Sequence, residues 1–353
     1  MQRIVETDRF RLVRLFAPEH GPYGHEQDME QVHSTPESST GLSVVSLYGN
    51  TAESLRPARS DLEDLDAIVA DLQDVGSRYY TFIYTLSYMM EAARDADLPL
   101  VVLDRPNPLG GLRVEGPVLV PELSSFVGRY PLPVCHGMTT GELARLFNDE
   151  FGIGCDLHVV ELGGWRRSMA FEDTRLPWVP PSPNMPTPTT ARVYPGGCLI
   201  EGTNLSEGRG TTTPFELVGA PWLDGHRLAA ELRGANTPGA LFRSASFRPM
   251  FQKHAAEPCS GVQVIVDDVE TFRPFSTYLA ILREARRQRP ESFRWRTETY
   301  EFETERLAID LLLGRPELKP MLESEAALEE LERSWEKELE EFSKLRQRFL
   351  VYS

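Results

Sequence analysis

The sequence predicts an α/β fold, in which a Rossmann-like parallel sheet domain is followed by a smaller α+β domain. In the first half, short apolar runs alternate with helical patterns, as they do in a parallel sheet covered by helices. A proline-rich stretch at residues 177–195 separates this half from one with mixed helical and β patterns. The length of 353 residues suits two domains. We therefore expect a Rossmann-like catalytic domain at residues 1–175 and a domain at residues 176–353 that closes the cleft.

The first half contains five apolar runs that predict strands, separated by two helical patterns. Between the third and fourth runs, residues 79–97 carry apolar side chains at intervals of three and four, which is the spacing of one helix face. Thr139 or Thr140 can cap a second helix that extends to about residue 151. The predicted strands are residues 12–16, 43–47, 67–72, 98–103 and 157–162.

The second half begins with a segment that proline keeps out of regular structure. Seven prolines lie between Pro177 and Pro195, so we expect a rigid, extended connection there. The last helix should present one apolar stripe, which docks on its own domain or forms a dimer seam. The predicted elements after the connection are helices at 223–233, 277–287 and 324–349 and a β-rich run at 261–266.

Charge, cysteine content and hydropathy exclude several classes of protein. The 37 Lys and Arg residues against 53 Asp and Glu residues leave a net charge of -16, which argues against nucleic-acid binding. The four cysteines are far apart and form no C-x-x-C pair, so neither a zinc ribbon nor a disulfide framework is expected. Residues 1–8 lack a signal-peptide core, and no apolar run is long enough for a membrane span. We therefore expect a cytoplasmic protein for the chain as written, and a secreted or periplasmic one if a leader precedes it.

Polar side chains follow three of the predicted strands, where ligands bind in open α/β sheets. Carboxylates and arginines that converge on one crevice are typical of an acid/base site, because neighbouring charges shift the pKa values of the carboxyl groups away from one another. Glu19 has no capping role that we can identify, whereas Asp71 and Asp74 suit helix caps and Asp104 and Arg105 suit a surface turn. The strand-end residues are Glu19, His20, Asp71, Asp74, Arg78, Tyr79, Asp104, Arg105 and Asn107.

A second polar stretch, residues 194–215, interleaves glycine with hydroxyl, amide, carboxylate and guanidinium groups. Glycine lets the backbone approach a ligand closely, so the stretch suits recognition of a sugar or a phosphate. It lacks the P-loop ending, and no G-x-G-x-x-G opens a helix, so a nucleotide cofactor has little support. The histidines match no zinc motif and no G-x-S-x-G is present, so we expect no metal, no cofactor and no serine nucleophile.

Seven segments of the sequence are distinctive: Leu15–Gly21, Ser46–Gly49, Asp71–Thr81, Leu103–Pro108, Cys135–Thr139, Pro181–Pro186 and Glu201–Phe215. Together they resemble the exo-β-N-acetylmuramidase family of peptidoglycan hydrolases. The resemblance implies release of N-acetylmuramic acid (MurNAc) from non-reducing ends of peptidoglycan chains during cell-wall turnover or recycling, with peptidoglycan fragments or MurNAc-GlcNAc saccharides as substrates. It also implies a Rossmann-like domain, a smaller α+β domain and a site between them.

One departure from that family concerns the start of the chain. Its members usually begin with a further strand and helix, so we expect the first βα unit to be missing from this sequence. Loss of that unit would also remove its ligand contacts. The alternative function is therefore a non-catalytic protein that binds peptidoglycan sugars.

The resemblance and the residue types together suggest roles in glycosidic hydrolysis by a pair of carboxyl groups. Glu19 is the expected acid/base, and its partner is Asp74, Glu201 or Glu207, unless the 2-acetamido group of the substrate acts as nucleophile. Guanidinium groups match the lactyl carboxylate of MurNAc in two hydrogen bonds, which suggests Arg78, Arg105 or Arg209. The residues expected to hold the sugar hydroxyls are His136, Asn184, Thr203 and Asn204.

Overall fold

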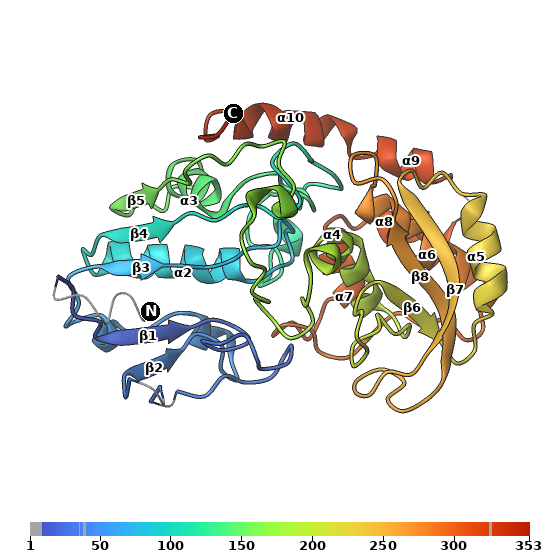
Figure 1. Cartoon of the computed structure of the whole chain (residues 1–353), viewed down its shortest axis with the longest axis horizontal. Coiled ribbons are helices and arrows are strands. Elements are labelled where there is room, and N and C mark those ends of the chain that lie inside the picture. Colours follow the sequence, from blue (N-terminus) through green and yellow to red (C-terminus); the bar gives the residue numbers. More distant parts are fainter. Residues whose placement is uncertain (1–8, 35, 38–39, 325–326) are drawn as a thin grey trace.

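The computed structural model describes residues 9–34, 36–37, 40–324 and 327–353. It is a mixed α/β structure with parallel strands in the first half and an antiparallel sheet in the second, which confirms the predicted fold class (Figure 1). Two buried apolar clusters form the core, one centred on each half. Residues 1–8, which bear on the expectation about a leader, lie outside the described residues.

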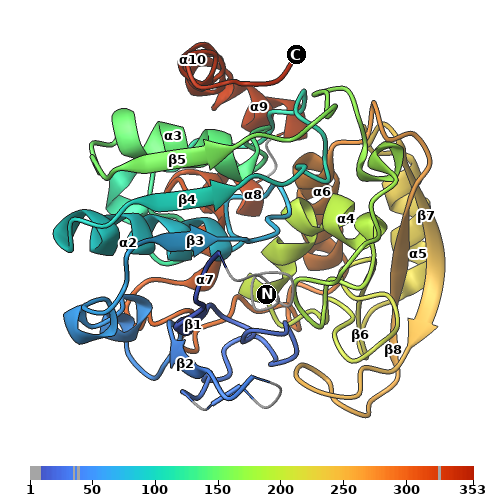
Figure 2. The same cartoon turned by 60° about the vertical axis from the view of Figure 1, so that its left-hand side comes forward.

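The first half is built on five parallel strands that divide between two sheets. β1 (Arg14–Ala17) pairs with β2 (Ser43–Ser46), and β4 (Leu100–Leu103) lies between β3 (Ile68–Ala70) and β5 (Leu157–Val160). Figures 1 and 2 show the five strands side by side in the order β2, β1, β3, β4, β5. The carboxyl ends of β1, β3 and β4 therefore face the same region of the molecule.

Two helices fill the core beside these strands at the predicted places. α2 (Phe82–Asp95) buries Ile83, Leu86 and Met90 on one face, as its three- and four-residue spacing predicts. α3 (Thr140–Asp149) begins where Thr139 accepts a hydrogen bond from the backbone N–H of Glu142. The Glu142 carboxylate in turn accepts from the backbone N–H of Thr139, which completes a capping box.

The second half is a three-stranded antiparallel sheet packed against helices. The strand order is β6 (Leu217–Ala220), β8 (Cys259–Val266), β7 (Ala240–Phe247), and α5 (Gly225–Arg233) and α6 (Pro274–Gln288) pack with it. The sequence analysis missed β7, because this edge strand mixes polar and apolar residues. Short 3-10 helices connect the elements: η1 (Ala52–Leu55), η2 (Arg59–Asp61), η3 (Pro121–Leu123), η4 (Phe171–Thr174) and η5 (Cys198–Gly202).

The prediction of an extended connection through Pro195 is wrong for its last third. Helix α4 (Pro188–Gly197) begins inside the proline-rich stretch. Thr187 caps it by accepting from the backbone N–H of Thr190, and Pro188 occupies the first turn, where a missing N–H costs no hydrogen bond. Gly196 then packs so closely against the Pro274 carbonyl of α6 that a Cβ would lie 2.1 Å from it. Packing against α6 therefore stabilises a helix that proline content argued against.

The predicted final helix at 324–349 is also wrong, because two helices occupy that stretch. After α7 (Ala308–Leu313) and α8 (Leu318–Glu323), the chain forms α9 (Leu328–Arg333) and α10 (Glu336–Arg346), while residues 325–326 lie outside the described part. Trp335 separates α9 from α10 with non-helical angles and packs edge-on against Phe275 at 5.6 Å between ring centroids.

The end of the chain returns from the second half to the first. Leu328, Leu331 and Trp335 belong to the apolar cluster of the second half, whereas Phe342 and Phe349 belong to that of the first. α10 accordingly lies above β4 and β5 in Figure 1. The C-terminal segment thus holds the two halves together. In the described part of the chain, every helix is too short or too polar to cross a bilayer.

A buried carboxyl group also joins the two halves and makes stability depend on pH. Glu115 accepts a hydrogen bond from the backbone N–H of Ser276 at the start of α6, and burial raises its pKa to about 7 despite the attraction of Arg113. Because the folded-state pKa lies above the unfolded value, the folded protein binds an extra proton between about pH 4.5 and 7. Stability should therefore fall as pH rises through that window, by about 3 kcal/mol at pH 8.

We expect Glu115→Gln to remove this part of the pH dependence. Glutamine stays neutral at every pH and can still accept from Ser276, so the variant should match the wild type near pH 5 and exceed it at pH 8. Urea unfolding between pH 4.5 and 8.5 measures the effect. Glu122→Gln, at an exposed position nearby, is the control. Parallel curves for wild type and Glu115→Gln would contradict the assignment.

Candidate active site

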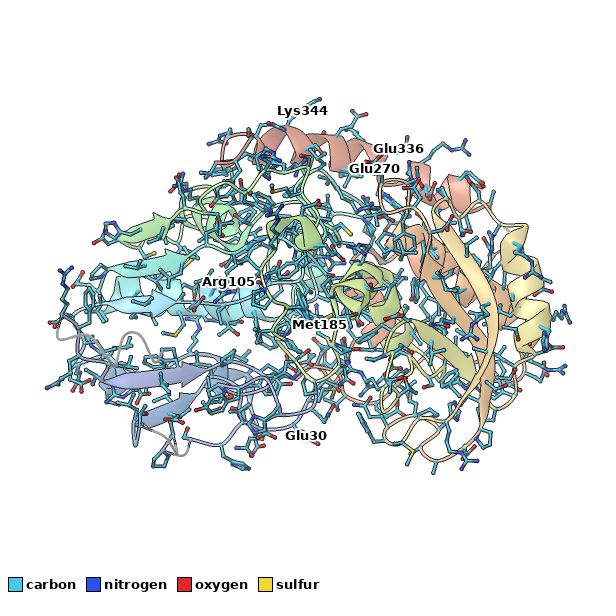
Figure 3. The ribbon with its side chains drawn as sticks, viewed as in Figure 1. Glu30, Arg105, Met185, Glu270, Glu336 and Lys344 are labelled. Atoms are coloured by element: carbon cyan, nitrogen blue, oxygen red, sulfur yellow. The ribbon has the colours of Figure 1, made fainter. Side chains whose placement is uncertain are left out.

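A polar pocket lies between the two halves and takes residues from both. The first half supplies the turn after β1 and the start of α2, and the second supplies residues after α4 and the turn at Tyr300–Glu301. Figure 3 shows Met185, which lines the pocket, near the middle of the molecule. The full lining is Glu19, His20, Asp28, Tyr79, Tyr80, Thr81, Val127, Ser182, Asn184, Met185, Tyr194, Glu201, Arg209, Phe215, Tyr300 and Glu301.

Glu19 is held in this pocket by the turn that ends β1. The backbone N–H of Gly21 donates to the carbonyl of Pro18, and His20 and Gly21 both adopt left-handed angles, with φ of 68° and 77°. The Thr81 hydroxyl donates to Oε2 of Glu19 at 2.6 Å, and the backbone N–H of Met29 approaches Oε1 at 3.4 Å. Glu19 is only 3% exposed, so both its position and its orientation are restricted.

Arg209 is the pocket residue of the second half around which several carboxylates gather. Its guanidinium group forms ion pairs with Asp28 at 2.8 Å, Glu201 at 2.5 Å and Glu207 at 3.2 Å. Burial alone would lower the pKa of Arg209, but these three carboxylates raise it well above its usual value. Burial raises the pKa of Glu201, which its attraction to Arg209 opposes. Arg209 therefore keeps several acidic groups together in one small space.

Two tyrosine hydroxyls hold two further carboxyl groups. Tyr300 donates to Oε2 of Glu201 at 2.7 Å, and Tyr48 donates to Oε2 of Glu301 at 2.8 Å. Glu301 is 7% exposed, and its pKa is raised well above the ordinary value by burial and then by the negative charge of Glu19. The pocket thus contains carboxyl groups in different electrostatic environments, as acid/base catalysis requires.

Six of the residues predicted from the sequence line the pocket. Among the described residues, the buried hydroxyl of Tyr79 is one of the side-chain groups without a hydrogen-bond partner in the protein. Asn184 donates to the Gln27 side chain at 2.8 Å, and His20 Nδ1 contacts the carbonyl of Glu26 at 2.9 Å. The six are Glu19, His20, Tyr79, Asn184, Glu201 and Arg209.

The remaining predicted residues at the strand ends lie outside the pocket lining and make contacts within the protein. Arg105, which Figure 3 labels beside the strands of the first half, forms an exposed ion pair with Asp71 at 2.6 Å. Asp74 accepts from the backbone N–H of Gly76 at 2.7 Å and lies 3.3 Å from Nε2 of the buried His136. Asn107 donates to the carbonyl of Met138.

Arg78 and Asp104 have structural partners as well. The Arg78 guanidinium donates to the carbonyls of Leu311 and Leu312, which lie in the last turn of α7. Cations at this end satisfy free carbonyls and oppose the helix dipole. Asp104 accepts from the hydroxyls of Thr139 and Tyr352 and from the backbone N–H groups of Arg105 and Gly141. These contacts link the strand ends to the C-terminal segment.

In the second half, three predicted residues lie between Glu201 and Arg209 in the chain but outside the pocket lining. Glu207 is bound by Arg209 and by Lys253, whose Nζ lies 2.7 Å from Oε2. The Thr203 hydroxyl donates to the carbonyl of Ile200, and the Asn204 side chain bridges Ser292 and Arg294. Their contacts shape the loop that carries Glu201 and Arg209.

Several pocket residues were missed by the sequence analysis. Thr81 lies in the segment Asp71–Thr81, so a signal for it was present. Asp28 lies in a polar loop that resembles any solvated loop, and Tyr300 and Glu301 follow no strand or glycine pattern that would single them out. Tyr48 binds Glu301 from outside the pocket lining; it directly follows the strand predicted at 43–47 and lies in the segment Ser46–Gly49, so a signal for it was present.

Comparison with known proteins gives one consistent result across the chain. Residues 1–189 match the protein family described as "Exo-beta-N-acetylmuramidase NamZ, N-terminal". Residues 192–352 match the corresponding family, "Exo-beta-N-acetylmuramidase NamZ, C-terminal". The peptidoglycan beta-N-acetylmuramidase NamZ of Bacillus subtilis (strain 168) is 46% identical over 349 residues, which cover 99% of this chain and 82% of that protein.

Solved structures agree with this result. A DUF1343 family protein from Bacteroides fragilis NCTC 9343 superposes with a TM-score of 0.87 at 32% identity, covering 100% of this chain and 89% of that one. A second DUF1343 family protein from the same organism gives a TM-score of 0.75 at 28% identity, covering 99% and 88%.

Proposed function

The chain belongs to the exo-β-N-acetylmuramidase NamZ family, and from this premise we propose that its pocket binds the terminal MurNAc residue of a peptidoglycan chain. The protein is a glycosidase, an exo-β-N-acetylmuramidase that acts on peptidoglycan. The proposed reaction releases MurNAc from the non-reducing end, and the smallest substrates are MurNAc-GlcNAc saccharides. A polar pocket lined by residues of both halves suits binding of a terminal sugar.

Glu19 is the proposed acid/base residue. The observation that supports it is a buried carboxyl group at the end of β1, held in the pocket by Thr81 and by the backbone of Met29. Glycosidases need such a group to transfer a proton to or from the reacting oxygen atoms. Of the partners proposed from the sequence, Glu201 lines the pocket, whereas Asp74 and Glu207 do not. Tyr79, Asn184 and His20 also line the pocket and are the residues proposed to hold sugar hydroxyls.

The lactyl carboxylate of MurNAc is the group that distinguishes it from N-acetylglucosamine. Among the three arginines proposed for it, only Arg209 lines the pocket, and three carboxylates already surround that guanidinium group. Binding through Arg209 therefore requires the substrate carboxylate to displace or share one of them. Competition of this kind would make recognition of MurNAc sensitive to the charge of Asp28.

The test is hydrolysis of a chromogenic aryl β-N-acetylmuraminide by the purified protein, beside the corresponding N-acetylglucosaminide. We expect turnover of the muraminide and release of free MurNAc from MurNAc-GlcNAc, followed by mass spectrometry. NMR of the first anomer formed distinguishes retention from inversion. Binding of MurNAc without turnover at high protein concentration would instead support the non-catalytic alternative, and equal hydrolysis of both glycosides would contradict the proposed specificity.

A further inference from the structure

We propose that Glu301 is the second carboxyl group of the reaction and protonates the leaving glycosidic oxygen opposite Glu19. This inference deepens the proposed function and rests on it. Glu301 lines the same pocket as Glu19 but comes from the second half of the chain, so the two carboxyl groups approach a bound sugar from different domains. Glu201, which the sequence singled out in the same half, also lines the pocket, but Arg209 and Tyr300 already bind its two carboxylate oxygens.

The backbone places Glu301 in the pocket by a strained turn. Glu301 and Phe302 both have left-handed angles, with φ of 48° and 67°, although neither is glycine. The turn is closed by paired backbone hydrogen bonds between Tyr300 and Glu303, at 3.0 and 2.9 Å. Two successive residues in this conformation cost free energy, and strain of this kind persists where the surrounding structure enforces it, commonly at functional sites.

Contacts from the first half enforce the turn. The ring of Phe302 packs edge-on against Tyr48 at 5.3 Å between centroids and against Phe126 at 6.0 Å. The Tyr48 hydroxyl donates to Oε2 of Glu301 at 2.8 Å, across 253 residues of sequence. Tyr48 is thus a positioning residue, since it fixes one oxygen of Glu301 and leaves the other for a ligand.

The charges around Glu301 favour its neutral form. Glu19, Asp28 and Glu201 all act on it, and the nearest pocket cation, Arg209, is already paired with Asp28 and Glu201. Burial together with these like charges raises the pKa of Glu301 well above its ordinary value, and the Tyr48 hydrogen bond only partly opposes this. A carboxyl group whose pKa is raised in this way favours its protonated form and is suited to donate a proton. Glu19, by contrast, accepts hydrogen bonds from Thr81 and Met29, which orients it as a proton acceptor.

Glu301 and Glu19 each transfer one proton in the same hydrolytic step. The bond between C1 of MurNAc and the glycosidic oxygen breaks, and that oxygen keeps the electron pair and takes the proton from Glu301. Water supplies the oxygen that bonds to C1, and its proton passes to the Glu19 carboxylate. Exchange with solvent then returns Glu301 to its acid form and Glu19 to its carboxylate form.

Leaving-group dependence tests this assignment. Glu301→Gln keeps the shape and neutrality of the acid but has no acidic proton. We expect it to lose about 10²–10⁴-fold in kcat on MurNAc-GlcNAc, whose sugar leaving group needs a proton, and less than about 10-fold on a dinitrophenyl muraminide, whose leaving group does not. The alkaline limb of the wild-type pH profile on the disaccharide should also disappear, because activity that needs protonated Glu301 falls as pH rises through its pKa.

Two further variants complete the experiment. Glu298→Gln, at an exposed position three residues earlier, should behave as wild type on both substrates. Tyr48→Phe keeps the ring that packs on Phe302, and it should lose more activity on the disaccharide than on the activated glycoside. If Glu301→Gln and Tyr48→Phe lost activity equally on both substrates, or not at all, the assignment of Glu301 would be overturned. Absence of wild-type turnover on both substrates would overturn the proposed function instead.

Discussion

Replacing Glu19 by glutamine should lower kcat by about 10²–10⁴-fold on every muraminide substrate, whatever its leaving group. Glutamine is nearly the same size and can still accept the hydrogen bond that Thr81 donates to Glu19. It cannot accept a proton from the attacking water or stabilise positive charge at C1 of the sugar. The loss should therefore appear in kcat, while KM and the thermal stability change little. Steady-state kinetics and a thermal melt measure both quantities.

The matched control for this variant is Glu30→Gln. Glu30 belongs to the same segment after β1 but is exposed, and Figure 3 shows it at the lower edge of the molecule. Its replacement should leave kcat and KM as in the wild type. If Glu19→Gln retained the wild-type rate while folding normally, Glu19 would not be the acid/base residue. The pattern also separates Glu19 from Glu301, since only the loss for Glu301→Gln should depend on the leaving group.

Replacing Arg209 by alanine should produce the largest loss of stability among the pocket variants. The change leaves Asp28, Glu201 and Glu207 without the guanidinium group that now contacts all three. Removing one partner of a buried ion pair typically costs about 3–5 kcal/mol, because the remaining charge stays buried without compensation. The guanidinium carbon of Arg209 also lies over the ring of Phe215, 5.0 Å from its centroid, and this cation–π contact is lost as well. Urea unfolding at pH 7 measures the difference from wild type.

A second substitution tests the electrostatic cause of this loss. In the Arg209→Ala background, Glu201→Gln removes one uncompensated charge but keeps an acceptor for Tyr300. The double variant should therefore recover part of the lost free energy of unfolding. Arg243→Ala, at an exposed position on β7, is the control and should change stability by less than about 1 kcal/mol. Additive losses for Arg209→Ala and Glu201→Gln would contradict the electrostatic explanation.

Local sequence could predict those site residues that directly follow parallel strands. Glu19 and His20 come directly after β1, and Tyr79 lies in the segment after β3, so the rule for ligands in open α/β sheets located all three. The same rule selected Asp104 and Arg78, whose side chains instead bind the C-terminal segment and the end of α7. The strand-end rule places a residue near the correct edge of the sheet. It does not decide whether its side chain meets a ligand or another element of the protein.

The predicted helices show the same limit. The hydrophobic spacing of α2 and the capping residues of α3 are local properties, and both helices occur where these patterns predict them. α4 contradicts its proline content because α6 packs against Gly196, and the terminal helix is divided because Trp335 packs against Phe275. In both cases a partner distant in sequence outweighed the local pattern, which carries no information about that partner.

The amino-acid sequence by itself determined the α/β class, the positions of the parallel strands and the placement of Glu19 at the end of the first described strand. These follow from periodicity and from the residues next to each strand, and both are read over a few neighbouring positions. Only the tertiary structure decided which charges share the pocket. It brought Tyr48 to Glu301 across 253 residues and gathered Asp28, Glu201 and Glu207 around Arg209. The protonation of a buried carboxyl group depends on its burial and on every nearby charge, and the fold sets both.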